Sequence, residues 1–342
     1  RSHCEKKLDF KTVALAETAS PLFGFLITIT LAKLNYGYLS LIYGFMANHI
    51  ASLACYMFMT RKVHVFGFFR SVAQLRRHLH YGVPVAGHRI QNQVITNCDI
   101  LIGSFFLSPQ LLGLYVVPRN FILKMQLVMN PVFGRVFFPY VAKFQNDMPR
   151  VRQSFLTISW LSSIVNVTMS GLLIFFSDIF INLYLGSSWG NYGSLVSVLA
   201  VWALFRGYVS PMGSLLLATG HTKRQFLWAL CVLAITPLVL IACVDEWGHM
   251  GLTYGMAGLA AFLVIPAWRF LVHPICHLRL RSYMNVVLSG SLIILTPMLL
   301  ISTLSNDFTY NTFARLCMAI ISVFFSLFFL YLLRKNGFYK FI

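Results

Sequence analysis

Acidic residues are scarce in this chain. Asp and Glu together number nine, against 27 Lys and Arg, which gives a net charge of +18. All but Glu17 and Asp99 fall at the ends of long apolar stretches or in the connections between them. Hydrolysis and glycosyl transfer usually need acids that converge on one site, so we expect no enzyme. The basic excess instead indicates an anionic partner, such as a membrane face or an anionic substrate.

Metal-binding and phosphate-binding motifs are also missing. The seven cysteines form no CxxC pair, and most lie in apolar stretches, as small core residues do. His273, Cys276 and His277 lie close together in the sequence HPICH, but its proline and its basic surroundings favour a surface turn. No Gly-rich phosphate loop, Gly-x-Ser-x-Gly or His-Glu-x-x-His is present. We therefore expect neither a metal nor a cofactor.

Apolar residues make up 58% of the chain and charged residues only 11%, with a mean hydropathy of +0.73. A water-soluble domain of this length could not bury so much apolar surface in one core. We predict an all-α, polytopic membrane protein, for which nucleic acid is not an expected partner. Ten stretches are long enough to span a bilayer, at 12–32, 36–59, 83–107, 110–138, 154–177, 192–218, 225–244, 248–272, 284–304 and 312–333.

The charges of the connections alternate. Clusters of Lys and Arg follow the second, fourth, sixth, eighth and tenth predicted spans, whereas the connections between these clusters carry acids or no charge, with Lys33 as the one exception. Lys and Arg are retained on the cytoplasmic side of membranes. The pattern predicts that both ends of this chain lie in the cytoplasm.

The third predicted span is unusually polar. At about 100° per residue, most of its polar side chains fall in one arc of roughly 140°, and apolar residues fill the opposite arc. The polar residues of this arc are His88, Arg89, Asn92, Gln93, Thr96 and Asp99. A polar face is costly in contact with lipid, so this arc should face other helices or a wet cavity.

Other cations also lie within predicted spans. Arg119, Lys124 and Arg206 are functional candidates because charges at this depth are expensive. The alternatives are snorkelling to the interface or ion pairs between helices, in which Asp99 or Glu17 could be partners. Two acids cannot neutralise all the cations, so we expect an interior that attracts anions. Prolines within the predicted helices would kink them, as suits alternating access, although channels use such kinks too.

Several stretches carry a resemblance to a known family. The most telling are Asn97-x-Asp99 followed by Ile102-Gly103, and the RVFFP turn at 135–139 followed by Gln145 and Asp147. LDFKTVALAETAS at 8–20, LGSSWG at 185–190 and GSLLLATGHTKRQF at 213–226 agree with it. The chain resembles the polysaccharide-exporter, colanic-acid-type branch of the multidrug/oligosaccharidyl-lipid/polysaccharide (MOP) flippase superfamily.

The resemblance implies a partial two-lobe MOP fold. Members have 14 helices, as two six-helix lobes and a final pair, and this chain resembles helices 5 to 14, so we expect the first four to be missing. Residues 1–60 would then be the end of the N-terminal lobe and 61–81 an amphipathic cytoplasmic link. Residues 82–275 would form the C-terminal lobe, and 276–342 the final helix pair with a cytoplasmic tail.

The resemblance also implies export of an undecaprenyl-pyrophosphate-linked oligosaccharide across a bacterial inner membrane, with a polysaccharide polymerase and other assembly proteins as possible partners. Cations suit the diphosphate and amides suit sugar hydroxyls. The candidates for anionic groups are Arg89, Arg119, Lys124 and Arg206, and those for the glycan are His88, Asn92, Gln93 and Asn97. Asp99 and Glu17 are possible ion-coupling sites, although a structural ion pair is an alternative for Asp99. The rival functions are a drug or cation antiporter of the same superfamily and an inactive, truncated membrane protein.

Overall fold

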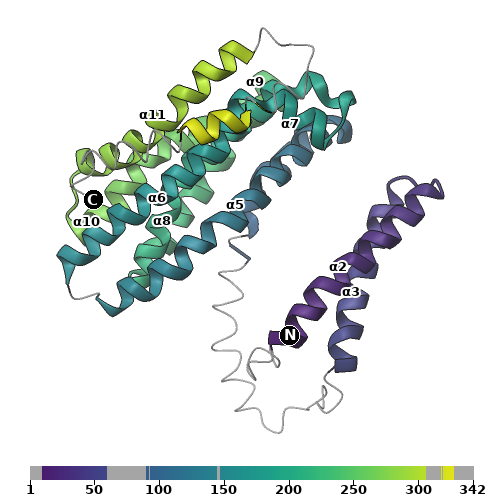
Figure 1. The fold of residues 1–342 in the computed structure, drawn as a ribbon, viewed down its shortest axis with the longest axis horizontal. Coiled ribbons are helices and arrows are strands. Elements are labelled where there is room, and N and C mark those ends of the chain that lie inside the picture. The colour runs from purple at the N-terminus through teal and green to yellow at the C-terminus, as the bar shows by residue number, and fades with distance from the viewer. Residues whose placement is uncertain are drawn as a thin grey trace. The chain divides into compact units, whose positions relative to one another are not determined.

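A computed structural model of the chain describes residues 10–59, 90–91, 93–144, 147–305, 317 and 319–326. Contacts divide the chain into two compact units, residues 1–84 and 85–342. No strand occurs in the described parts, which are almost entirely helical. The predicted all-α class is therefore confirmed (Figure 1). The predicted link at 61–81 lies outside the described residues.

The first unit contains a helical hairpin, α2 (Phe10–Lys33) and α3 (Leu39–Met59). Its turn uses two positive backbone angles, at Asn35 (φ 63°) and Gly37 (φ 52°). The two helices approach closely where Gly24 of α2 faces Asn48 of α3, and a Cβ on Gly24 would lie 2.7 Å from the Cβ of Asn48. Small residues permit this close packing of membrane helices.

The second unit begins with the described helix Gln93–Phe106. The elements that follow are α5 (Pro109–Lys143), α6 (Met148–Phe175), α7 (Ser177–Tyr184), the 3₁₀ turn η1 (Ser187–Tyr192), α8 (Gly193–Ala218), α9 (Thr222–Ala267), the π-helical η2 (Trp268–Val272), α10 (His273–Cys276) and α11 (Leu280–Ser305). Helix α8 packs against α5, α6 and α9, and α11 packs against α6. The unit is thus a bundle arranged around α8.

The long α9 consists of two helices. Gly248 interrupts it with φ 55° and ψ −134°, a backbone conformation that favours glycine. The two halves run back along each other, because a Cβ on Gly251 would collide with the backbone of Cys243. This break agrees with the separate spans predicted at 225–244 and 248–272.

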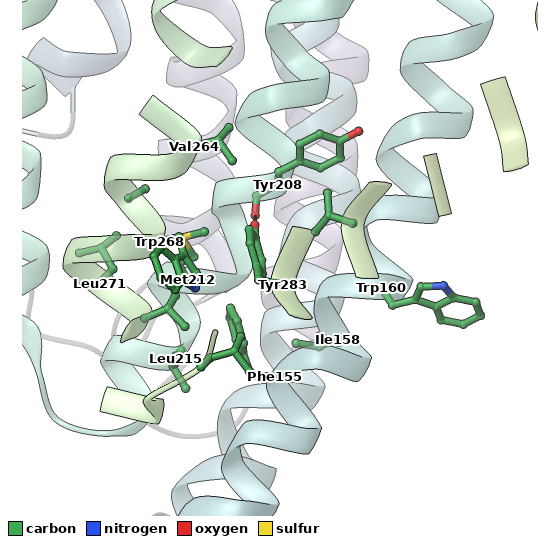
Figure 2. Packing of buried hydrophobic residues seen from close by; sticks show 14 of the residues in the cluster. Phe155, Ile158, Trp160, Tyr208, Met212, Leu215, Val264, Trp268, Leu271 and Tyr283 are labelled. Carbon is green, nitrogen blue, oxygen red and sulfur yellow. Dashed lines mark hydrogen bonds between the residues drawn. The ribbon is translucent and has the colours of Figure 1, made fainter. Parts of the chain in front are cut away.

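Aromatic residues and hydrogen bonds join α6, α8 and α11 (Figure 2). Phe155 of α6 stacks with Tyr283 of α11, with ring centroids 6.1 Å apart. The Tyr283 hydroxyl donates to the backbone oxygen of Tyr208 at 2.9 Å, the dashed contact in Figure 2. Since the Tyr208 hydroxyl bonds Ser291 at 2.7 Å, Tyr208 of α8 contacts α11 at two residues about two turns apart. The apolar core therefore contains a few satisfied polar groups that fix how these helices meet.

Six helical stretches in the described residues are long and apolar enough to cross a membrane. One of them, Thr222–Cys276, covers two predicted spans because it contains the kinked α9. The predicted span 110–138 lies within α5, and 83–107 is described as a helix over Gln93–Phe106. Only part of the predicted span 312–333 is described, and residues 319–326 of it are helical. The polytopic architecture is confirmed, while the finer domain boundaries stay predictions.

Candidate functional site

Three of the predicted ligands, His88, Arg89 and Asn92, lie outside the described residues. The structure places the other seven in three different settings. Asp99 and Arg119 contact each other between two helices, and Arg206 lines a cavity. Four side chains, Gln93, Asn97, Lys124 and Glu17, are exposed or half-buried on helix surfaces.

Asp99 and Arg119 form a buried ion pair between the helix Gln93–Phe106 and α5. Each residue is only 1% exposed. Arg119 donates from Nε to Asp99 Oδ2 at 2.7 Å and from Nη2 to Oδ1 at 2.7 Å, which is a two-pronged contact. Tyr115, one turn before Arg119, donates its hydroxyl to Asp99 Oδ2 at 2.6 Å. The carboxylate therefore accepts three hydrogen bonds from α5.

The remaining Arg119 contacts complete this cluster. Its Nη1 donates to the side chain of Asn120 at 3.0 Å, and its Nη2 also contacts the backbone oxygen of Thr96. A buried charge is tolerated when it is paired and hydrogen-bonded. For Asp99, the alternative to ion coupling was a structural ion pair. The structure places Asp99 and Arg119 in such a pair. In this conformation, its guanidinium is not exposed to a solvent-filled space.

Arg206 of α8 has a different environment. It is exposed and lines a cavity of about 220 Å³ between the helix Gln93–Phe106, α8 and both halves of α9. Its guanidinium carbon lies 5.4 Å from the ring centroid of Trp202, one turn earlier. Among the described carboxylates, none forms an ion pair with Arg206. The arginine is therefore held on an aromatic face, where a cation–π contact stabilises it, and faces open volume.

The walls of this cavity are mainly apolar and aromatic, with a few polar groups. Thr96, Trp202, Trp228 and Thr236 are the lining side chains that carry a hydroxyl or an indole N–H beside Arg206. Concave, mostly apolar sites with a few placed polar groups are typical of ligand sites. The cavity can thus accept an anionic group that also has an apolar part.

The other predicted residues do not share one site. Gln93 is exposed, and its backbone oxygen accepts a hydrogen bond from Asn97 Nδ2 at 3.1 Å. Lys124 is exposed on α5, and Glu17 is exposed on α2 in the first unit. Of the predicted polar arc, Thr96 lines the Arg206 cavity whereas Asp99 points to α5. The arc is therefore divided between a cavity and a helix contact.

The sequence interpretation missed Tyr115, Trp202 and Trp228. A signal was available for two of them, because Tyr115 precedes Arg119 by four residues and Trp202 precedes Arg206 by four. Residues at this spacing are neighbours on a helix surface. Trp228 carried no such signal, since only the packing of α9 brings it to the cavity.

The HPICH motif, for which we predicted a surface turn, forms the short helix α10 over His273–Cys276. It ends at His277, which adopts a left-handed conformation with φ 47°. Cys276 is buried and His273 contacts Arg269 Nη1 through Nδ1 at 3.0 Å. Within the parts of the chain that the structure describes, no group of three metal-ligating side chains is found.

The relatives found among curated proteins include three that are named for the biosynthesis of a polysaccharide. The chain is 25% identical over 284 residues to the lipopolysaccharide biosynthesis protein WzxC of Escherichia coli, covering 83% of this chain and 58% of WzxC. It is 27% identical over 215 residues to the teichuronic acid biosynthesis protein TuaB of Bacillus subtilis, covering 62% and 44%. It is 23% identical over 304 residues to the amylovoran biosynthesis protein AmsL of Erwinia amylovora, covering 88% and 78%. The chain thus spans about half the length of the first two relatives.

A solved structure shows the same fold. The lipid II flippase MurJ, in an inward closed conformation, matches with a TM-score of 0.69 at 18% identity, over 93% of this chain and 67% of that chain. This likeness confirms the predicted MOP-type fold. The family described as polysaccharide biosynthesis protein matches residues 1–194. Since this match covers more than half of the chain, the protein belongs to that polysaccharide biosynthesis family.

Proposed function

We propose that this chain takes part in flipping an undecaprenyl-pyrophosphate-linked oligosaccharide from the cytoplasmic to the periplasmic leaflet by alternating access. The observation that carries this proposal is Arg206, an exposed arginine that stacks on Trp202 and faces a cavity within a membrane bundle. A cation at membrane depth is costly and is kept where it meets a substrate or an ion. The family and the names of the relatives support a role in polysaccharide assembly.

The size of the cavity limits what it binds. At about 220 Å³ it is below the range of sites for drug-sized ligands, so a whole oligosaccharide repeat unit cannot enter. One phosphate or one carboxylate with its apolar attachment does fit. We infer that Arg206 binds an anionic group of the substrate. We propose that the glycan contacts the polar side chains of the predicted span 83–107, which are His88, Asn92, Gln93 and Asn97.

The roles of the other cations follow from their surroundings. Lys124 is exposed and could meet the anionic substrate together with Arg89. Arg119 is buried in the pair with Asp99, so we assign it a supporting role: it holds Thr96, one wall of the cavity, through the backbone oxygen. Asp99 takes part in ion coupling only if this pair opens during the cycle, and Glu17 is a second coupling candidate.

The charges at the two ends of the second unit support an orientation. The end that includes α10 also includes the end of α5 and the starts of α6, α9 and α11. The basic residues in or next to these segments are Lys143, Arg150, Arg152, Lys223, Arg224, Arg269, Arg279 and Arg281. Asp147 at this end pairs with Arg150 at 2.9 Å. The opposite end carries Asp178, Asp245 and Glu246. We call the end that includes α10 the basic end. By the positive-inside rule, we propose that the basic end faces the bacterial cytoplasm.

Two alternatives lead to different observations. A drug or cation antiporter would need an acidic cavity, whereas the cavity described here contains Arg206 and no described carboxylate. An inactive membrane protein would keep its packing but would not need a charge at Arg206. A polysaccharide polymerase and other assembly proteins are proposed partners of the active exporter.

The experiment is complementation of a host that lacks its own exporter. The native gene for this chain is expressed as wild type, as Arg206→Gln, as Arg206→Lys and as the control Arg281→Gln, which changes an exposed arginine at the basic end. We expect wild type and the control to restore surface polysaccharide and Arg206→Gln to reduce it at least about tenfold, as loss of a charge-assisted contact does. Arg206→Lys should retain part of the activity.

Protein levels in the membrane are measured for every variant. Equal export by wild type and Arg206→Gln at equal protein levels would refute the anion role of Arg206. Failure of the wild type to restore export would favour the inactive alternative. Export that continues after proton and sodium gradients are collapsed would exclude ion coupling through Asp99 or Glu17.

A further inference from the structure

The basic end of the second unit contains an aromatic contact between two arginine-bearing segments. The ring of Trp228 in α9 stacks with the ring of Phe270 in η2, with centroids 6.1 Å apart and an interplanar angle of 29°. Arg224 lies one turn before Trp228 on the same face of α9. Arg269 directly precedes Phe270. The stack therefore brings two cationic side chains to neighbouring turns.

Neither arginine is neutralised by a described carboxylate. Arg269 is exposed and contacts His273, which must accept through Nδ1 because a guanidinium only donates. Arg224 is half-buried, and its Nη1 is buried without a hydrogen-bond partner. A buried donor without an acceptor costs free energy. The cluster therefore carries two positive charges that no described carboxylate balances, which favours a ligand with negative charge.

The surface beyond the cluster is apolar and exposed. Phe226, Leu227 and Leu230 extend from the Arg224 end of α9, and Phe262 and Ile265 extend from the Arg269 end. The pattern of cations, then aromatic rings, then aliphatic side chains matches the order of phosphate, glycerol region and acyl chains in a bilayer leaflet. A free phosphate ion would use the arginines but not this apolar surface.

We propose that Arg224 and Arg269 bind the phosphate of an anionic phospholipid at the basic end, with Trp228 and Phe270 beneath the headgroup and the acyl chains along α9. The site adjoins the Arg206 cavity, because Trp228 also lines that cavity. Its two arginines are different from Arg206, which lies twelve residues, about 18 Å along the helix axis, before the end of α8. The inference does not depend on which substrate is transported, because it uses only the charges and rings at the membrane boundary.

The test is native mass spectrometry of the purified chain in detergent, with phosphatidylglycerol and phosphatidylcholine added separately at equal concentration. We expect wild type to retain phosphatidylglycerol preferentially. The double variant Arg224→Gln/Arg269→Gln should weaken phosphatidylglycerol binding about thirtyfold, in line with the contribution of two basic residues near an anionic headgroup. Arg224→Lys/Arg269→Lys should retain most of the binding, because the charge is kept.

The matched control is Arg279→Gln/Arg281→Gln, which removes the same charge from the exposed start of α11 at the same end. We expect it to change binding by less than about twofold. Equal loss of phosphatidylglycerol binding in both double glutamine variants would overturn the proposal, because it would show that the lipid responds to the total positive charge of this end and not to a specific site. Equal retention of the two lipids, or displacement by millimolar inorganic phosphate, would also overturn it. Size-exclusion profiles of all variants verify that each is folded. If the double glutamine variant aggregates, Arg224→Gln and Arg269→Gln are measured singly against Arg279→Gln and Arg281→Gln, and equal binding by all four would overturn the site.

Discussion

Arg119 and Arg206 are both arginines inside predicted membrane spans, and the structure gives them opposite environments. Arg119 is 1% exposed and makes a two-pronged contact with Asp99. Arg206 is exposed, stacks on Trp202 and lines a cavity. The first charge is enclosed between two helices, whereas the second faces open volume. Depth in the membrane alone therefore does not separate a cation buried in an ion pair from one that lines a cavity.

The difference depends on the partner that each arginine contacts, a carboxylate from another helix or an aromatic ring from its own helix. The helix Gln93–Phe106 presents a carboxylate to Arg119, and the cost of burying the two charges is offset by their attraction and by further hydrogen bonds. α8 presents an aromatic ring to Arg206, which stabilises the cation without neutralising it. We therefore expect substitutions at the first to affect stability and substitutions at the second to affect export.

The largest effect should come from breaking the buried pair on one side. Asp99→Asn leaves the Arg119 guanidinium buried without its counter-charge, which costs about 3–5 kcal/mol. The measurement is the free energy of unfolding in mixed micelles, together with the yield of folded protein. A loss below about 1 kcal/mol would show that the pair is solvated or open in the membrane.

A smaller loss is expected for Tyr115→Phe. This variant removes one hydrogen bond to the Asp99 carboxylate, the one at 2.6 Å, and leaves the ion pair in place. Hydrogen bonds to charged groups contribute roughly 1.5–3 kcal/mol, so the unfolding free energy should fall by this amount. The matched control is Tyr184→Phe, which changes an exposed tyrosine; a similar loss in the control would mean that the Asp99 contact is not the cause.

Removing both charges together should be milder than removing one. Asp99→Leu/Arg119→Met replaces the pair with apolar side chains of similar volume, and such replacements of buried pairs are often neutral or stabilising. We expect the double variant to lie within about 1 kcal/mol of wild type. A double variant as unstable as Asp99→Asn would mean that the contacts of Arg119 to Thr96 and Asn120 are essential by themselves.

The smallest effect on stability is expected at Arg206. Since its side chain is exposed to the cavity, Arg206→Gln should change the unfolding free energy by no more than about 0.5 kcal/mol, as surface substitutions do. The same variant should lose export in the complementation experiment. A large stability loss would instead place Arg206 with Arg119 as a structural charge and would remove the contrast between them.

Hydropathy predicted most helix positions closely. The span predicted at 192–218 is α8, Gly193–Ala218, because its length and apolar content leave few alternatives. The end of α5 was underestimated: the helix continues to Lys143, five residues beyond the prediction. The turn predicted at 135–139 is wrong, because α5 stays helical through this RVFFP sequence and its proline. The pairing of Asp99 with Arg119 was only one of several possibilities. The two residues are twenty positions apart in the sequence and lie on different helices. Whether their side chains meet depends on how each helix is rotated about its axis, and the sequence alone does not specify this packing.

The contacts of Asp99 with Tyr115 and Arg119 also bear on how this family varies. A relative that loses the carboxylate at position 99 by mutation keeps a buried, unpaired arginine at position 119. A second substitution that removes this arginine is therefore favoured. The two positions should therefore change together across an alignment of relatives, with charged pairs or apolar pairs and few mixed combinations. Such correlated exchange would let the rotation of the helix Gln93–Phe106 against α5 be inferred in relatives for which only sequences are known.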